Sequence, residues 1–494
     1  MATNRTKQVS TLRVGRLFAT PGRRPPNYGA TVRIDNGVIV GVKTAGRIDD
    51  VRSGRHLVAM PALANAHDHG RGLHHVAFGA KDQQFELWRP ALYAHPPVDP
   101  YLNAALAYGR LARAGVGSVM HVHSSILVHR LIDDAEAICR AARDVGIRLA
   151  FVVPLRDKQS LGHADDEELI ALHDPRDHDT IRQTWLYDFP PPDEYMQLVK
   201  EIARRVEGPT ISVQYGPNSP QACTDALLER IAASAAADGR RVTTHFLETR
   251  VQRQWADATY PQGFVKHLDQ LGVLSERFTG AHGVWLRPDD VDLLAERGAQ
   301  IAVNTSSNLR LRSGIAPVAQ YIKSGMRFSF GIDSFSFDDD DDAFREMRVG
   351  HWLHSLNQSD APLATEKLFE GWHRNAFYAV NNSDDYGEVK AGAPADLVVL
   401  DYDAMAYDII EGMAEELDII LTRAGNRYID RVIVAGREIV RGGKVLGIDM
   451  DAVEKEVLAQ ARAAGDDMRQ LKPVLDRSTA TLDEFYRSGK HAAQ

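Results

Sequence analysis

The sequence predicts an α/β protein, a (β/α)8 barrel joined to a small β domain built from both chain ends. Strand-like apolar runs alternate with helix-like stretches over about 310 residues in the middle of the chain, which is typical of a parallel sheet. Eight such units indicate a closed barrel rather than an open sheet. Short strand-like segments with turn signals occupy both ends, and neither end supplies enough strands for a stable sheet alone.

The eight barrel strands are predicted from apolar runs that end in polar residues. The first is the run 57–60, directly before His67, and the other seven span 117–122, 148–153, 210–214, 241–245, 278–282, 300–303 and 327–332. Amphipathic helical patterns lie between most of them, for example at 102–114, 132–145 and 226–237.

The β domain is predicted from segments far apart in the sequence. Runs 30–34 and 38–42 flank Asp35-Asn36-Gly37, a strong hairpin signal, and further β-rich runs lie at 395–400, 431–434 and 438–440. We therefore expect residues 1–60 and 388–445 to form one composite domain. The barrel is expected to span 61–387, and a helical segment to span 446–494.

Composition narrows the class of protein. The chain has 494 residues, of which 44% are hydrophobic, and a net charge of -9, which argues against nucleic-acid and membrane surfaces. The two cysteines, Cys139 and Cys223, cannot form a disulfide framework, and no apolar run is long enough to span a membrane. We expect a cytoplasmic protein that binds neither nucleic acid nor membranes and forms a homodimer or a higher homo-oligomer.

Polar side chains gather where the predicted strands end. His67 and His69 are two residues apart, so in a strand both imidazoles point to the same side. His245 follows the fifth run, His282 the sixth and Asp333 the eighth. Barrel strands all end at one mouth, where such groups meet. Three or four nitrogen and oxygen ligands with an open position describe a catalytic site for zinc or iron.

The spacing also suggests how such a site would work. A metal held by His67, His69, His245 and Asp333 would lower the pKa of a bound water towards neutrality. Glu248, three residues after His245, is placed to carry that proton to a leaving nitrogen. His282 is expected to hydrogen-bond the water or the developing oxyanion.

Five segments resemble motifs of the amidohydrolase superfamily. They are PALANAHDHG (61–70), THFLET (244–249), AHGVWL (281–286), GID (331–333) and SSNLRLRSGIAPV (306–318). The chain resembles the branch of aminohydrolases that includes cytosine, guanine and S-adenosylhomocysteine deaminases and triazine hydrolases. This resemblance implies a TIM-like barrel with a β-sandwich and one metal ion. It implies metal ligation by His67, His69, His245 and Asp333, and catalytic roles for Glu248, His282 and Asp333.

The chain departs from that branch at two positions where relatives often have a histidine facing the substrate. Here they are Asn218 and Asn304, and we expect both to make neutral hydrogen bonds with the substrate. That expectation predicts weak turnover of adenosine-type, cytosine and guanine substrates. The chain also has an extra pair, His121 and His123, which is either a hydrogen-bonded pair at the barrel mouth or a substrate contact.

Three further features bear on the site. Arg310 is expected either to reach an anionic substrate group or to form a surface salt bridge. The run 338–342 is read as a solvated loop whose last aspartate caps a helix near residue 343. The fourth run, 210–215, has no lysine of the kind that bridges two metals in binuclear relatives, so one metal ion is expected.

The sequence therefore predicts a metal-dependent hydrolase that cleaves a C–N bond of a nitrogen heterocycle or cyclic amidine. Attack by a metal-bound hydroxide would release ammonia or an amine. One divalent metal ion per chain is expected: zinc, with iron or manganese as alternatives. Ring opening of a cyclic amide, urea hydrolysis and dechlorination remain alternatives on the same site. An inactive binding protein on the same fold is an alternative of another class.

Overall fold

The computed structural model describes residues 7–50, 53–92, 94–125, 127–186, 189–356 and 363–492. Its centre is an eight-stranded parallel sheet in which the strands lie side by side in chain order. The strands are β6 (Leu63–Asp68), β7 (Val116–Val122), β8 (Arg148–Leu155), β9 (Ile211–Pro217), β10 (Val242–Phe246), β11 (Phe278–His282), β12 (Gln300–Val303) and β13 (Arg327–Phe330). Seven of the eight predicted runs coincide with β7 to β13, which confirms the predicted barrel architecture.

The sheet closes into a barrel where the segment that follows β13 contacts the end of β6. The backbone amides of Ile332 and Asp333 donate to the carbonyl of His67, at 3.2 and 2.9 Å. A Cβ at Gly331 would lie 2.8 Å from the His67 backbone and 2.4 Å from Asn304 Oδ1, so only glycine allows this approach. The last and first strand ends are thereby joined, which brings Asp333 beside His67.

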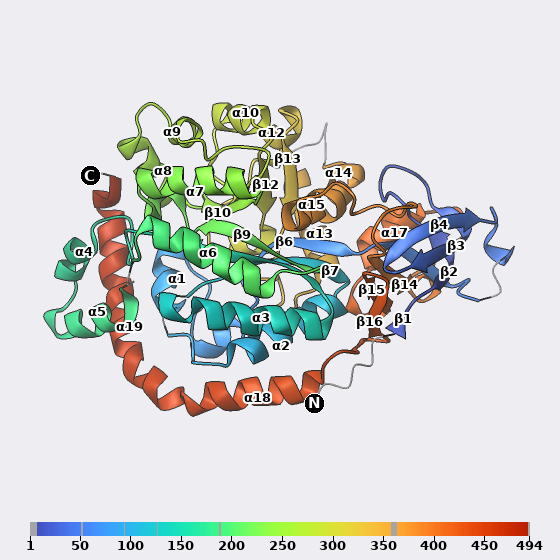
Figure 1. Ribbon diagram of the computed structural model, residues 1–494, viewed down its shortest axis with the longest axis horizontal. Coiled ribbons are helices and arrows are strands. Elements are labelled where there is room, and N and C mark those ends of the chain that lie inside the picture. Colours follow the sequence, from blue (N-terminus) through green and yellow to red (C-terminus); the bar gives the residue numbers. More distant parts are fainter. Residues whose placement is uncertain are drawn as a thin grey trace.

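Helices surround the barrel and follow the strands in order (Figure 1). They are α1 (Phe85–Leu92), α2 (Pro100–Arg113), α3 (Leu131–Val145), α4 (Asp166–Leu172), α5 (His178–Trp185), α6 (Pro192–Val206), α7 (Asp225–Asp238), α8 (Arg250–Thr259), α9 (Phe264–Gln270), α10 (Pro288–Glu296), α11 (Thr305–Arg310), α12 (Val318–Lys323), α13 (Ala343–Ser355), α14 (Thr365–Glu370) and α15 (Ala376–Asn381). Most of them, α2, α3, α6 to α10 and α12 to α14, contribute apolar side chains to one large core shared with the barrel strands.

The first barrel strand is not the one that was predicted. The run 57–60 belongs to β5 (Leu57–Pro61), which pairs antiparallel with β14 (Leu397–Asp401) in the other sheet. The barrel begins two residues later with β6, which itself carries His67. Both strands are buried along their whole length, so hydrophobic pattern alone does not distinguish them.

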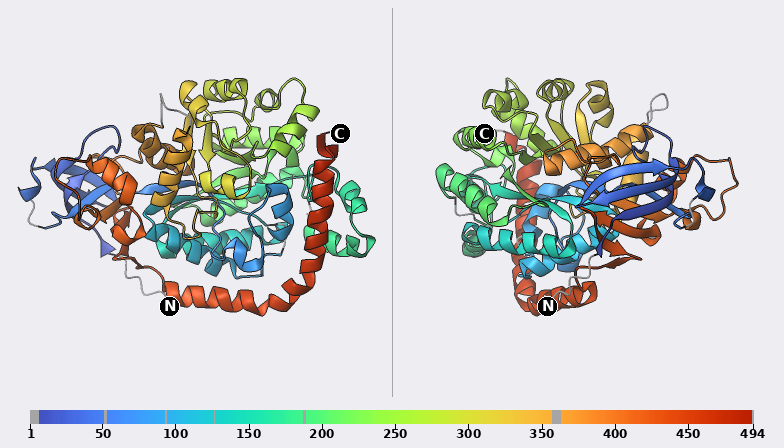
Figure 2. Two further views of the ribbon diagram at one scale, coloured as in Figure 1. Left: turned by 180° about the vertical axis from the view of Figure 1, so that it is seen from behind. Right: turned by 45° about the vertical axis from the view of Figure 1, so that its right-hand side comes forward.

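Strands from both chain ends form one further sheet of nine strands, as predicted (Figure 2). Its order is β1-β16-β15-β14-β5-β2-β3-β4, with β17 beside β16. The members not yet given are β1 (Lys7–Gln8), β2 (Thr11–Leu17), β3 (Asn27–Asp35), β4 (Val38–Thr44), β15 (Ile429–Val434), β16 (Arg437–Arg441) and β17 (Lys444–Val445). The predicted hairpin turns at Asn36 and Gly37, both at positive φ. The exact domain limits stay a prediction.

Deleting residues 1–55 is expected to give insoluble protein. The deletion removes β2 to β4, whose apolar side chains share a core with the C-terminal strand β14: Leu12, Val14 and Val32 pack with Leu397 and Val399. Without them, the remaining sheet would expose that apolar face and an unpaired strand edge. The measurement is the soluble fraction after expression. A soluble, active barrel lacking these residues would contradict the expectation.

Two helices cross the outside of the barrel. The segment α18 (Met450–Ala463) and α19 (Gly465–Arg487) runs along one side and up the end opposite the β domain (Figures 1 and 2). Leu482, Phe485 and Tyr486 of α19 pack on the segment that contains α4 and α5. Two shorter helices, α16 (Tyr402–Met405) and α17 (Glu416–Arg423), lie among the C-terminal strands in sequence. Within the described ranges, no helix is both long and apolar enough to cross a membrane.

The aspartate run after β13 ends as predicted, but it is solvated only in its first part. The Asp342 carboxylate accepts from the backbone amides of Phe344 and Arg345 at the start of α13, which confirms the predicted cap. Asp341 and Asp342 are both buried, however. Burial raises the pKa of Asp341 to about 8.

Asp341→Asn is expected to stabilise the protein at alkaline pH. Because the folded pKa lies above that of an exposed aspartate, the folded state binds the proton more tightly, and stability falls as pH rises from about 4 to about 8. A neutral side chain removes this fall, so the free energy of unfolding at pH 8 should rise by on the order of 1 kcal/mol. Denaturant unfolding of both proteins at pH 5 and pH 8 measures the effect. A variant that is less stable at pH 8 would refute the expectation.

Candidate metal centre and active site

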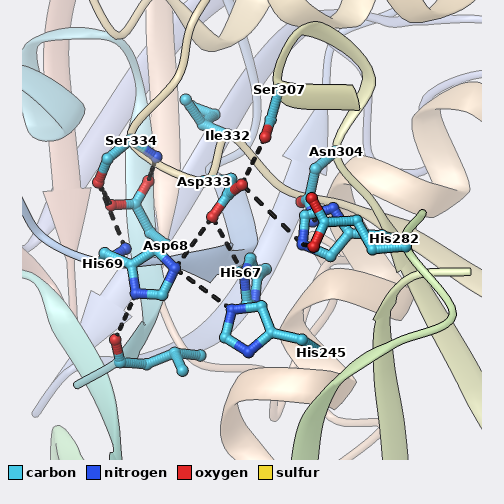
Figure 3. Close-up of polar contacts among 12 residues, drawn as sticks. His67, Asp68, His69, His245, His282, Asn304, Ser307, Ile332, Asp333 and Ser334 are labelled. Atoms are coloured by element: carbon cyan, nitrogen blue, oxygen red, sulfur yellow. Dashed lines mark hydrogen bonds and ion pairs between the residues drawn. The ribbon is translucent and has the colours of Figure 1, made fainter. Parts of the chain in front are cut away.

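Four side chains from three parts of the barrel converge at its mouth (Figure 3). The Nε2 atoms of His67 and His69, at the end of β6, each lie 3.2 Å from Asp333 Oδ1. His245 Nε2, from the end of β10, lies 3.4 Å from His69 Nε2. The structure thus brings together all four residues that the sequence predicted as metal ligands.

Hydrogen bonds behind these side chains set which nitrogen faces the centre. His69 Nδ1 donates to the carbonyl of Val122 at 2.7 Å, and His245 Nδ1 donates to the carbonyl of Asn218 at 2.6 Å. A neutral imidazole that donates through Nδ1 presents a lone pair on Nε2. Backbone carbonyls commonly orient metal-ligating histidines in this way.

The donor set fits a cation. Lone pairs on His69 Nε2 and His245 Nε2 face each other and the Asp333 carboxylate across little more than 3 Å, an arrangement that is repulsive unless a positive ion lies between them. His67 is wholly buried, and its Nδ1 has no hydrogen-bond partner among the described residues. An unsatisfied buried imidazole is costly, whereas metal ligation satisfies it.

The pKa values fit ligands in the required state. Burial holds the pKa of His245 well below its usual range and lowers that of His69, so both are neutral. Burial alone would raise the pKa of Asp333, but its contacts with His67 and His69 outweigh burial and hold the pKa well below its usual range. Neutral imidazoles and an ionised carboxylate are the forms that bind metals.

The protein is expected to bind one metal ion per chain. Within the described part of the chain, two overlapping groups have metal-binding geometry, one of His67, His69 and His245 and the other of His67, His282 and Asp333. Both need His67, and one nitrogen lone pair binds one ion. Elemental analysis of protein dialysed against metal-free buffer measures the ratio. Two tightly held ions per chain would contradict this expectation.

Glu248 lies beside the centre with one oxygen uncommitted. The backbone amide of Glu248 donates to Gln252 Oε1 at 2.7 Å, and Ser313 Oγ donates to Glu248 Oε1 at 3.2 Å. Its Oε2 has no hydrogen-bond partner within the described structure and lies 3.9 Å from His282 Nε2. Burial, and next the Asp333 charge, raise the pKa of Glu248 well above its usual range. Such a group can take up and release a proton near neutral pH.

His282 completes the far wall of the centre. Its Nδ1 donates to Asn308 Oδ1 at 2.9 Å, which leaves Nε2 directed at Asp333 Oδ2, 4.0 Å away. Burial lowers the pKa of His282 to about 4. His282 and Asp333 both have positive φ, at 73° and 61°, an uncommon backbone conformation for such residues that often marks functional sites.

The predicted substrate contacts divide into two groups. His121, His123 and Asn218 line the cavity above the centre. The two histidines also contact each other, with 3.4 Å between His121 Nε2 and His123 Nδ1, and His123 Nε2 lies 3.4 Å from Asp134 Oδ2. Both alternatives for this pair, a bonded pair and a cavity wall, therefore coexist in one arrangement.

Asn304 and Arg310 do not line the cavity. Asn304 is wholly buried behind His282, with 3.4 Å between Asn304 Nδ2 and His282 Nδ1, and it is not part of the cavity wall. Arg310 forms ion pairs with Asp82 and Asp339 outside the cavity. Of the two roles left open for Arg310, the structure favours the salt bridge. The carboxylates of Asp82 and Asp339 already pair with its guanidinium.

Several residues of the cavity wall were not predicted from the sequence. It has a volume of about 320 Å³, and its wall includes Arg71, Trp88, Arg156, His163 and Phe335. Sequence reasoning missed the arginines because a charged residue in a loop normally points to solvent. The one available signal was position, since Arg71 follows His69 by two residues.

Comparison with known proteins identifies the family. The model of the amidohydrolase family matches residues 58–439, which is most of the chain. The chain belongs to the amidohydrolase family. Family membership confirms the resemblance drawn from the five motifs.

Curated relatives match over most of their length. The chain is 26% identical over 446 residues to a 5'-deoxyadenosine deaminase of Methanosarcina barkeri, covering 89% of this chain and 93% of the relative. It is 25% identical over 419 residues to a 5-methylthioadenosine/S-adenosylhomocysteine deaminase of Thermococcus sibiricus, covering 83% and 89%.

Solved structures share the fold. An adenosine deaminase from Xanthomonas campestris with bound zinc superposes with a TM-score of 0.74 at 22% identity, covering 93% of this chain and 98% of that one. A triazine hydrolase variant gives a TM-score of 0.75 at 19% identity, covering 92% and 100%. Both matches cover most of the chain and support the fold described above.

Proposed function

We propose that this amidohydrolase is a metal-dependent deaminase that cleaves an exocyclic C–N bond of a nitrogen heterocycle and releases ammonia. The observation that carries the proposal is the protonatable Glu248 beside a cluster of metal-binding acceptors, both opening into one cavity. Deaminases and hydrolases of heterocycles among the relatives support it.

The metal would be held by His67, His69, His245 and Asp333. Zinc is proposed, because imidazole and carboxylate ligands suit it and a structural neighbour is described with bound zinc. When bound, a divalent ion polarises water and stabilises charge that develops on oxygen.

The chain's own residues would then move protons and orient the substrate. Glu248 accepts a proton from the attacking water and delivers it to the leaving nitrogen, so a C–O bond forms as the C–N bond breaks. His282 Nε2 faces the same space from the opposite wall, 3.9 Å from Glu248 Oε2, where it can hydrogen-bond the oxygen that enters. Asp333 takes up the second proton of the water and returns it to a ring nitrogen, so the carboxylate is regenerated. The products are the oxo-heterocycle and ammonia.

A substrate panel tests the proposal. The zinc-loaded protein is incubated with adenosine-type nucleosides, cytosine, guanine, aminotriazines, chlorotriazines and cyclic amides, and products are followed by ammonia release, chloride release and mass spectrometry. Ammonia release with a mass change of one oxygen for one NH supports deamination. Chloride release or ring opening would instead establish one of the alternative hydrolase activities, and binding without turnover an inactive scaffold.

We also propose that the protein acts on small molecules in the cytoplasm as a homo-oligomer, without nucleic-acid or membrane partners. The net charge of -9 supports the absence of a polyanion-binding surface. Light scattering of the purified protein measures the oligomeric state, and a monomer at micromolar concentration would contradict this part of the proposal.

A further inference from the structure

Arg71 is a cation on the cavity wall without a carboxylate partner. Its Nη1 donates to His75 Nε2 at 2.6 Å, and its guanidinium carbon lies 5.9 Å from the ring centre of Trp88. No Asp or Glu oxygen in the described structure lies within ion-pair distance of it. The guanidinium therefore keeps donors that neither His75 nor Trp88 satisfies.

The nearby carboxylates are already committed. Asp68 accepts from the amide of Gly70 at 2.8 Å and from Ser334 Oγ at 2.6 Å, and its other oxygen accepts from Asn65 Nδ2 at 2.8 Å. Asp333 belongs to the metal-binding cluster. Neither is available to neutralise Arg71.

Three buried arginines of the described structure lie outside the cavity wall, and two of them form ion pairs. Arg148 Nε donates to Asp396 at 2.6 Å, and Arg253 Nη1 donates to Asp290 at 2.7 Å. Arg241 lacks a carboxylate, but it donates to Thr279 Oγ1 at 3.0 Å and does not line the cavity. Arg71 differs from all three because it lines the cavity.

The backbone holds Arg71 in place. Gly70 has φ 61°, and a Cβ there would lie 2.4 Å from His121 Nδ1, so the chain turns tightly against the cavity wall. The Arg71 amide then donates to Ser334 Oγ at 3.4 Å, beside the metal-binding Asp333. The position of Arg71 is thus tied to that of the metal centre.

The charged residues of the cavity wall also favour an anionic ligand. Its wall carries three arginines, Arg71, Arg89 and Arg156, and two carboxylates, Glu248 and Asp333. Both carboxylates lie at the metal end, where a divalent cation would add further positive charge. A desolvated cation without a partner is unfavourable until an anion enters.

We propose that the substrate is a nitrogen heterocycle bearing an anionic group, a carboxylate or a phosphate, that binds Arg71. This inference rests on the proposed function and specifies its substrate class. The planar guanidinium can form a bidentate hydrogen bond with a carboxylate or a phosphate. Trp88 offers a flat apolar surface beside it. The heterocycle then lies between Arg71 and the metal centre, within a cavity of about 320 Å³.

Matched substrate pairs test the inference on the zinc-loaded protein. The pairs are cytosine with 5-carboxycytosine and adenosine with adenosine 5'-monophosphate, which separate carboxylate from phosphate. The wild-type protein should favour the charged member of one pair by about tenfold or more in kcat/KM, the usual effect of a hydrogen-bonded charge pair. Arg71→Met should abolish that preference, and Arg71→Lys should retain part of it.

Arg250→Met is the matched control. Arg250 is exposed at the start of α8, close in sequence to Glu248 but outside the cavity wall, so its loss removes the same charge and should not alter the preference. Metal content is measured for every variant. A wild-type preference for the neutral members, or an equal loss on both members in Arg71→Met, would overturn the inference.

A binding measurement separates this inference from the proposed function. Calorimetry compares nicotinate with nicotinamide, which differ in charge and need no turnover. Tighter binding of nicotinate that disappears in Arg71→Met supports the inference even if no panel compound is deaminated. Equal binding of the two probes, or nicotinate binding that survives in Arg71→Met, overturns it even if deamination is found.

Discussion

Glu248→Gln is expected to lower kcat by about a hundredfold or more while the metal stays bound. The amide preserves the size of the side chain and can still contact Ser313, but it cannot carry a proton between water and the leaving nitrogen. Since Glu248 is not among the groups with metal-binding geometry, the ion should remain. Burial raises the pKa of Glu248 well above its usual range, which favours a form that can donate a proton.

The measurement combines ammonia release with elemental analysis of the same preparation. Glu346→Gln is the matched control, because Glu346 is also a buried glutamate, bonded to Ser306 Oγ at 2.9 Å, and lies outside the cavity wall. Its variant should retain turnover. Near-normal turnover in Glu248→Gln would show that another group moves the proton.

His69→Ala and His282→Asn are expected to separate binding of the metal from its use. His69→Ala should weaken metal binding by about tenfold to a hundredfold or more and abolish activity, because it removes a ligand whose Nδ1 is already anchored on Val122. His282→Asn should keep the metal and lower kcat by about a hundredfold.

Metal affinity from competition with a chelator, together with turnover, distinguishes the two candidate ligand sets. If His282→Asn loses the metal and His69→Ala keeps it, the ligands are His67, His282 and Asp333, the second group with suitable geometry. The fold control is the thermal unfolding midpoint of each metal-free variant.

Much of the metal centre was predictable because strand ends in a parallel barrel meet at one mouth. His67, His69, His245, Glu248, His282 and Asp333 follow apolar runs in sequence, and each lies at or just beyond a strand end in the structure. Strand periodicity and connection order are local properties, so the sequence carries them. The same holds for the Asp342 cap, whose partners are the next few backbone amides.

Other features depend on contacts between segments that are far apart in the sequence. The run 57–60 and β6 are equally apolar, and only pairing with β14 assigned the former to the β domain. Arg310 forms a salt bridge with Asp82, 228 residues away in sequence, and so does not reach the cavity as a substrate contact. The local sequence pattern around a residue does not indicate such distant partners.

The sequence by itself determined the fold class, the kind of chemistry and the candidate ligands, since these depend on residue identity and short-range spacing. Only the tertiary structure decided which polar groups remain unsatisfied. Asn304 and Arg71 show this most directly. Asn304 stands at a motif position but lies buried behind His282, whereas Arg71 lies in a loop and faces the cavity without a counter-ion. The free energy of a charge depends on its surroundings in space, and those are set by packing across the whole chain.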